Sequence, residues 1–115
     1  MRTWTTLAAL AGLACVAFGA FGAHGVADPK AQGWLRTGAE YGMVHALAVF
    51  AATWIGGKAR FAAPVFLLGV VIFAGSLFAM GLGGPRWLGA VTPLGGLSFM
   101  AGWALLAWGA ATRQT

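Results

Sequence analysis

Four long stretches without a charged residue divide this chain. They lie between nine Lys, Arg, Asp and Glu side chains and cover residues 3–27, 41–57, 61–85 and 87–112. Ala, Gly, Leu, Val and Phe dominate each stretch. An apolar helix of about 20 residues crosses the ~30 Å hydrocarbon core of a bilayer, at ~1.5 Å per residue. The pattern therefore predicts an all-α protein, a transmembrane four-helix bundle.

The second predicted helix is too short if it contains only charge-free residues. Residues 41–55 alone would span ~22 Å, so this helix must begin earlier. The segment Thr37-Gly38-Ala39-Glu40 offers a capping box, in which the Thr37 hydroxyl and the Glu40 carboxylate bind free N–H groups of the first turn. The helix is therefore expected to begin at Thr37, which leaves residues 25–36 as the longest polar connection.

Glycine and proline mark the other helix ends. Asp28-Pro29 follows the first helix, Gly56-Gly57 the second and Gly83-Gly84-Pro85 the third. Pro93 falls inside the fourth helix and is predicted to kink it, as membrane helices tolerate. The chain is expected to form one integral membrane domain, residues 1–115, with helices at about 4–23, 37–55, 61–82 and 87–111.

Composition agrees with a membrane location. The chain is 60% hydrophobic and only 8% charged, which lies outside the range of soluble globular domains. The net charge of +5 is spread over the short polar segments, so it forms no basic patch for nucleic acid and fits lipid headgroups better. Cys15 is the only cysteine, so it is expected to be a small packing residue.

The distribution of cations and tryptophans predicts the topology. With four spans, both termini lie on one side, with four cations against three on the other side, which slightly favours cytoplasmic termini in the cell (inner) membrane. The four are Arg2, Lys58, Arg60 and Arg113, and the three are Lys30, Arg36 and Arg86. An aromatic belt is expected at both interfaces, with Trp4, Trp54 and Trp108 at one and Trp34 and Trp87 at the other.

Small residues recur along single faces of two predicted helices. In the first helix they are Ala8, Gly12, Cys15 and Gly19, and in the fourth they are Gly95, Gly102 and Gly109. Such seams let helix backbones approach closely in lipid, where no hydrophobic force holds helices together. We expect Gly12, Gly19, Gly95 and Gly102 to be helix-packing positions, and such seams are compatible with a homo-oligomer.

Six polar side chains are expected inside the membrane. They are His24, Glu40, Tyr41, His45, Ser76 and Thr92. At ~1.5 Å per residue, all of them fall in the half of the bilayer next to residues 25–36, with His45 deepest at ~12 Å. The hypothesis is a shallow polar pocket that opens toward this side and has His45 at its floor.

Each of the acidic and basic members also has a structural explanation. Glu40 fits a helix cap that pairs with Arg36 one turn earlier, rather than a proton carrier. His24 faces headgroups, or turns inward if its helix breaks at Gly22. His45 is too deep to remain unpaired, so it should face the bundle and form a hydrogen bond. Whether that bond is structural or functional stays open.

The hydroxyl groups have similar alternatives. Ser76 is more often a hydrogen bond between helices than a ligand contact, and Thr92 is expected to bond back to its own helix beside Pro93. Tyr41 and His45 share one helix face, because they are four residues apart.

No metal, cofactor or enzymatic activity is predicted. A zinc or iron centre needs at least three convergent ligands, and the ~10 Å difference in depth between His24 and His45 argues against one shared centre, even with Asp28 and Glu40 nearby. No catalytic triad, phosphate-binding loop or dinucleotide fingerprint occurs.

Four segments together resemble a known family. They are residues 19–25 (Gly-Ala-Phe-Gly-Ala-His-Gly), 41–47, 73–77 (Phe-Ala-Gly-Ser-Leu) and 88–96 (Leu-Gly-Ala-Val-Thr-Pro-Leu-Gly-Gly). The ordered set resembles the uncharacterised YgdD/YwdK-type family of small four-span bacterial inner-membrane proteins. The resemblance implies a multi-pass membrane protein with no known activity. The family often has amide side chains near positions 40–42, where this chain has Glu40 and Gly42.

Two functions are compatible with these features. The first is a non-enzymatic membrane component that takes part in assembly or interacts with lipid. The alternative is a small oligomeric transporter or channel, in which His45, Tyr41 and Glu40 would carry protons or a small solute. The lipid bilayer is the expected partner in both cases, and nucleic acid is not.

Overall fold

The computed structural model describes residues 2–113, and its regular structure there is entirely helical. Four α-helices are α1 (Arg2–His24), α2 (Pro29–Ile55), α3 (Ala62–Gly81) and α4 (Thr92–Thr112). Two 3-10 helices, η1 (Gly57–Phe61) and η2 (Arg86–Ala90), precede α3 and α4. The predicted all-α class is confirmed.

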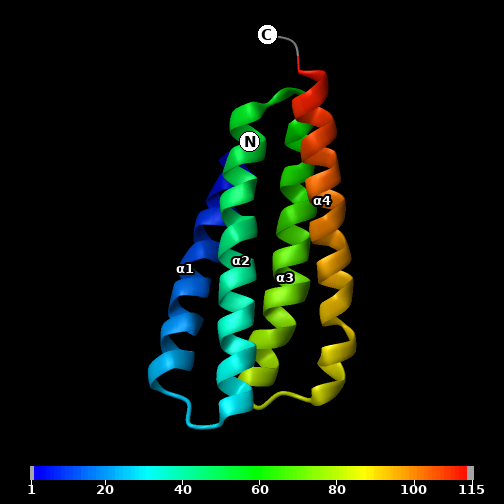
Figure 1. Ribbon diagram of the computed structural model, residues 1–115. Coiled ribbons are helices and arrows are strands. Elements are labelled where there is room, and N and C mark those ends of the chain that lie inside the picture. The colour runs from blue at the N-terminus through cyan, green and yellow to red at the C-terminus, as the bar shows by residue number, and fades with distance from the viewer. Residues whose placement is uncertain (1, 114–115) are drawn as a thin grey trace.

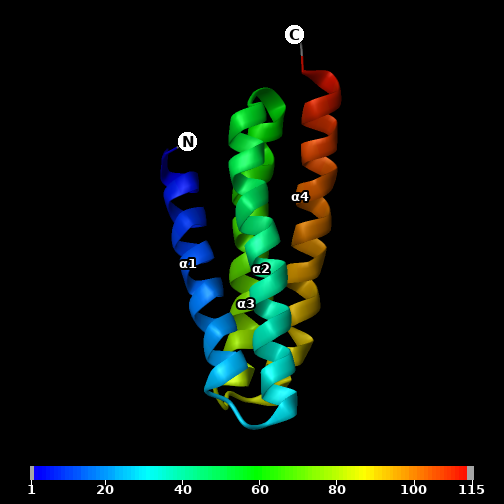
Figure 2. The same cartoon turned by 60° about the vertical axis from the view of Figure 1, so that its left-hand side comes forward.

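The four helices run up and down and form a flat, elongated bundle (Figure 1). Its principal extents are 51 × 24 × 18 Å, so the long axis exceeds the ~40–45 Å thickness of a bilayer with headgroups. In both views α1 and α4 lie on opposite sides of the central pair α2 and α3 (Figure 2). Within the described residues α1 packs on α2 and α3, α4 packs mainly on α3, and α1 does not touch α4.

The predicted start of the second helix is wrong. α2 begins at Pro29, two turns before Thr37, and Asp28 is its N-cap, with carboxylate oxygens that accept from the N–H groups of Lys30 and Ala31. Proline suits the first helical turn, where its missing N–H costs nothing. The capping box at Thr37 therefore does not exist, and the connection contains only residues 25–28.

The predicted kink at Pro93 is also wrong. α4 begins at Thr92, so Pro93 lies in its first turn, and residues 86–90 form the separate 3-10 helix η2. Because the first N–H groups of a helix have no intrahelical acceptor, proline disturbs no bond there. The other helix ends agree with the expected ones within one or two residues.

Among the described residues, three helical segments are long and apolar enough to cross a membrane, as judged by length and composition. They are Arg2–His24, Gly57–Gly81 and Arg86–Thr112. α2 is longer but less apolar, because it carries Lys30, Arg36 and Glu40 together with Tyr41 and His45. It packs along both α1 and α3, so the molecule is a transmembrane four-helix bundle in which the most polar helix lies beside two apolar ones.

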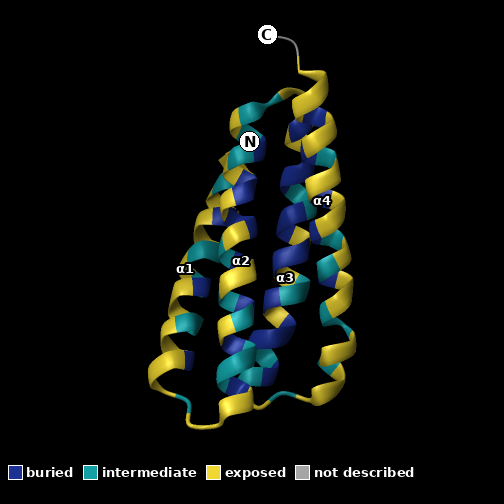
Figure 3. Cartoon of the chain, viewed as in Figure 1, coloured by how far each residue is buried: buried dark blue, intermediate teal, exposed yellow. Residues whose placement is uncertain are grey.

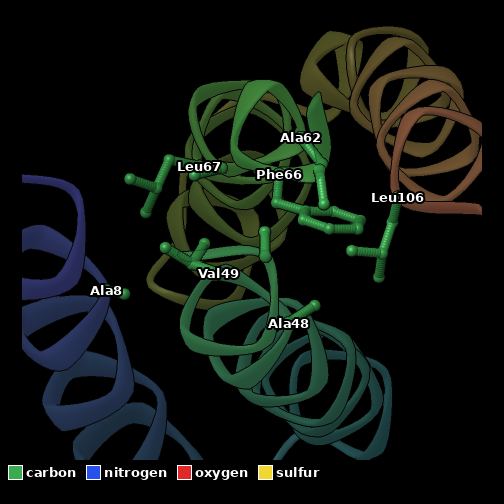
Figure 4. Packing of buried hydrophobic residues seen from close by; sticks show 10 residues of the cluster. Ala8, Ala48, Val49, Ala62, Phe66, Leu67 and Leu106 are labelled. Atoms are coloured by element: carbon green, nitrogen blue, oxygen red, sulfur yellow. The ribbon is translucent and has the colours of Figure 1, made fainter. Parts of the chain in front are cut away.

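The core follows α3, the most buried helix, whereas α1 and α4 expose long outer faces (Figure 3). Figure 4 shows Phe66 of α3 among Ala48 and Val49 of α2 and Leu106 of α4. A second cluster, nearer the end of the bundle that holds residues 25–28, contains Cys15, which is a free, buried thiol as expected. Long apolar side chains on the outer faces are normal here, because the surrounding solvent is lipid.

Both small-residue seams are used inside the bundle. A Cβ atom added at Gly102 would lie 2.5 Å from the Phe66 ring, and one at Gly19 would lie 3.1 Å from the Cβ of Ala39. Gly95 faces the backbone of α3 equally closely, whereas Gly12 has a looser contact with Met43, at 3.8 Å from its sulfur. The close contacts at Gly19, Gly95 and Gly102 therefore hold α1 and α4 to the central pair, and a homo-oligomer stays a prediction.

Candidate functional site

His45 forms the centre of the polar structure inside the bundle. Its side chain is 6% exposed, and both ring nitrogens are hydrogen-bonded. Nδ1 lies 2.6 Å from the Tyr41 carbonyl oxygen, which can only accept, and Nε2 lies 3.0 Å from the indole N–H of Trp103, which can only donate. These roles assign one tautomer, the neutral imidazole with its proton on Nδ1.

Aromatic rings enclose this imidazole. Phe99 of α4 stacks on it with ring centroids 3.5 Å apart and an interplanar angle of 6°. Trp103 meets it edge-on at 5.8 Å, and Phe66 lies tilted at 5.8 Å. Tyr41 and Phe73 extend the cluster toward the loops, with their centroids 5.2 Å apart. The ring of His45 thus connects α2 to α3 and α4 by stacking and by hydrogen bonds.

A groove lies over this cluster, where α2 and α4 approach without packing closely. We call it the α2–α4 groove. Its volume is about 390 Å³, and nine residues line it: Tyr41, His45, Phe73, Pro93, Gly96, Leu97, Phe99, Met100 and Trp103. A second hollow of about 330 Å³ shares Tyr41, His45 and Trp103 with it and adds Val44 and Glu40. Almost all of this surface is apolar.

The other predicted hydroxyls pair with each other beside the groove. The Ser76 and Thr92 oxygens lie 2.5 Å apart, which links α3 to the start of α4. Ser76 also lies 2.9 Å from the Phe73 carbonyl, and Thr92 lies 3.2 Å from that of Leu88. Two hydroxyl protons cannot make all three bonds at once, so the pair has two alternative hydrogen-bond directions.

The six predicted residues thus divide into four groups. Tyr41 and His45 line the groove, Ser76 and Thr92 pair beside it, and Glu40 lies on the exposed rim of the second hollow. His24 is exposed at the end of α1, which continues through Gly22, so the inward alternative is not realised. The expected polar pocket is instead an apolar groove, because the polar groups at its floor bind one another.

The predicted pairing of Glu40 with Arg36 is absent. Both side chains are exposed on α2, and the described residues contain no ion pair between them. Nor do three His, Cys, Asp or Glu side chains anywhere in residues 2–113 come together as a metal site would require.

Three important residues were missed by the sequence analysis. Trp103 and Phe99 complete the environment of His45, and the Ser98 hydroxyl donates to the Val65 carbonyl of α3 at 2.8 Å. One signal for Trp103 was available: it is the single tryptophan of six that falls at neither predicted interface. A tryptophan N–H at mid-membrane depth needs an acceptor, and His45 was the obvious one.

Comparison with known proteins gives consistent results. A family model described as "Protein of unknown function (DUF423)" matches residues 18–96, more than half of the chain. A UPF0382 membrane protein of Haemophilus influenzae is 40% identical over 88 residues, which cover 73% of this chain and 71% of that protein. No solved structure matches the chain.

Two further relatives carry similar names. The UPF0382 inner membrane protein YgdD of Escherichia coli is 43% identical over 84 residues, 68% of this chain, and the UPF0382 membrane protein YwdK of Bacillus subtilis is 35% identical over 87 residues, 70% of each chain. The match covers 63% of YgdD, which is less than two thirds of that protein.

Proposed function

This chain belongs to the DUF423 family, as its resemblance to YgdD and YwdK predicts, and from that membership we propose that it is a non-enzymatic inner-membrane protein that binds lipid chains in the α2–α4 groove. The observation that carries the proposal is the groove itself. It is apolar, and its volume of about 390 Å³ lies in the usual range of ligand sites, about 300–1,000 Å³.

The position of the groove favours a lipid chain as its occupant. Leu97 and Met100 on its α4 wall are 61% and 67% exposed, so the groove opens sideways onto the surface that faces the hydrocarbon. An acyl chain fits such a surface because contacts inside a bilayer are made by close packing. The rings of Phe73 and Phe99 provide a rigid floor for those contacts.

The absence of catalysis is supported by the state of His45. A general base needs a free nitrogen within reach of a substrate, but both nitrogens of His45 are already bonded. Proton transport is less well supported for the same reason, since a second proton on the ring would have to displace the Trp103 N–H. We therefore propose neither an enzyme nor a proton carrier.

Photolabelling with a phospholipid that carries a diazirine on one acyl chain tests the proposal. In reconstituted vesicles we expect labelled peptides to concentrate at Leu97 and Met100. Gly96→Phe should reduce this labelling several-fold, because Gly96 lines the groove and a Cβ atom added there meets nothing within 4 Å. The new ring can therefore fill the groove without disturbing the helices.

Gly75→Phe is the matched control. Gly75 is also helical and open to an added Cβ atom, but it is exposed on α3 outside the groove lining. Labelling should remain unchanged in this variant. Labelling of Leu68 and Val71 on the exposed face of α3 as strongly as Leu97 and Met100 would contradict the proposal.

We also propose cytoplasmic termini. Both termini lie at the same end of the bundle (Figure 1). Four of the seven cations are assigned to this side, whereas Asp28 caps the opposite end of α2 and Glu40 lies in the first half of that helix. Positively charged ends remain in the cytoplasm. A fusion of green fluorescent protein after Thr115 should fluoresce, and alkaline phosphatase at the same position should be inactive. Active phosphatase there, with a dark fluorescent fusion, would reverse the orientation.

A further inference from the structure

Glu40 is a charged group near the apolar groove, and its side chain has no hydrogen-bond or ion-pair partner among residues 2–113. It lies four residues beyond Arg36 toward the middle of α2, or ~6 Å deeper along the helix. Its side chain is exposed on the rim of the second hollow, next to Tyr41, Val44 and Trp103. Ionisable side chains at membrane depth are costly, and they usually mark a binding site or have a partner.

The surrounding elements offer no cation to this carboxylate. Arg36 on the same helix does not pair with it, and the groove residues from α3 and α4 are apolar or aromatic. His45, the remaining nitrogen base nearby, has both ring nitrogens bonded in its neutral form. A positive charge at this position would therefore have to come from a ligand.

Aromatic rings beside Glu40 would favour such a ligand. Tyr41 is 51% exposed and Trp103 is 44% exposed, and both line the hollow that Glu40 borders. The face of an aromatic ring attracts organic cations, and tryptophan does so most strongly. The same two rings continue into the α2–α4 groove, where an attached apolar group finds room.

We propose that the second hollow, together with the α2–α4 groove that adjoins it, binds a lipophilic cation, an organic ammonium or phosphonium ion. Its charge lies between Glu40, Tyr41 and Trp103, and its apolar body occupies the groove. This inference rests on the proposed function, because the same groove holds the apolar part of the ligand. It adds a selectivity for charge that binding of neutral lipid chains does not require.

The test is isothermal titration calorimetry, in which tetraphenylphosphonium is titrated into the full chain in the uncharged detergent dodecyl maltoside. The unaltered protein should bind the ion saturably, and Glu40→Gln should weaken binding about tenfold or more, as expected for loss of a partly desolvated charge pair. Asp28→Asn is the matched control, because it removes the only other acidic side chain while asparagine still caps α2. Its affinity should be unchanged.

Two results would overturn the inference: absence of saturable binding by the unaltered protein, or equal affinity of Glu40→Gln. Photolabelling of the same Glu40→Gln preparation with the diazirine phospholipid tests lipid binding in the groove separately from cation binding. Labelling at Leu97 and Met100 would also show that the variant is folded. If the groove is still labelled in this variant and Glu40→Gln does not change phosphonium binding, the proposed cation selectivity is wrong but lipid binding in the groove is not contradicted. Labelling spread evenly over the unaltered protein removes the groove as a lipid site altogether.

Discussion

Gly95→Leu is expected to destabilise the bundle by about 3 kcal/mol or more, because α4 can no longer lie against α3. A Cβ atom at position 95 would lie 2.7 Å from the Cβ of Phe73 and 2.8 Å from its Cα. Backbone atoms of a helix cannot move aside as the end of a flexible side chain can. The whole of α4 would have to shift, and the stacking of Phe99 on His45 would be lost with it.

The adjacent glycine provides the control for this prediction. Gly96→Leu adds the same side chain one residue later, where an added Cβ atom meets nothing within 4 Å. Thermal unfolding in detergent, followed by circular dichroism, should show a much lower melting temperature for Gly95→Leu than for Gly96→Leu. Equal melting temperatures would mean that α4 does not pack on α3 through Gly95.

Trp103→Phe is expected to cost about 1–2 kcal/mol, because it removes the donor to Nε2 of His45 while keeping an aromatic ring. The imidazole is 6% exposed, so neither water nor lipid can replace the lost N–H. An unpaired buried acceptor carries its full desolvation cost, which exceeds the net gain from a satisfied hydrogen bond.

A double-mutant cycle separates this bond from general packing. In His45→Leu/Trp103→Phe the acceptor is absent as well, so the loss of stability should be smaller than the sum of the two single losses. Trp108→Phe is the control, since Trp108 lies near the chain ends, where Lys58 lies 4.8 Å from its ring. Additive losses in the cycle would show that the bond between His45 and Trp103 contributes nothing to stability.

The fold was largely predictable because length and hydropathy are local properties of a membrane helix. The expected ends of the first three helices, near residues 23, 55 and 82, agree with the structure, since glycine and proline stop a helix wherever they occur. The starts of α2 and α4 were misplaced for a related reason. Asp28-Pro29 was interpreted as a break and Pro93 as a kink, although proline equally favours the first turn of a helix.

The site was predictable in depth but not in its contacts. Counting residues from the loops placed Tyr41, His45, Ser76 and Thr92 in one half of the bilayer, and the structure pairs Ser76 with Thr92 directly. The same count could not show that His45 accepts from Trp103, which is 58 residues away in sequence. That contact depends on how far α2 and α4 are rotated about their axes, and rotation is decided by the packing of both helices on α3.

The hydropathy of consecutive residues is enough to establish that this protein is helical, that its surroundings are lipid, and that few polar groups enter the membrane. What those polar groups bind depends on how the helices pack against one another. Close approach at Gly95 and Gly102 brings α4 onto α3, which places Trp103 within hydrogen-bond distance of His45, while Glu40 stays exposed at the rim of the second hollow. These contacts depend on helix rotation and on distances between segments, and neither is encoded in the pattern of any single segment.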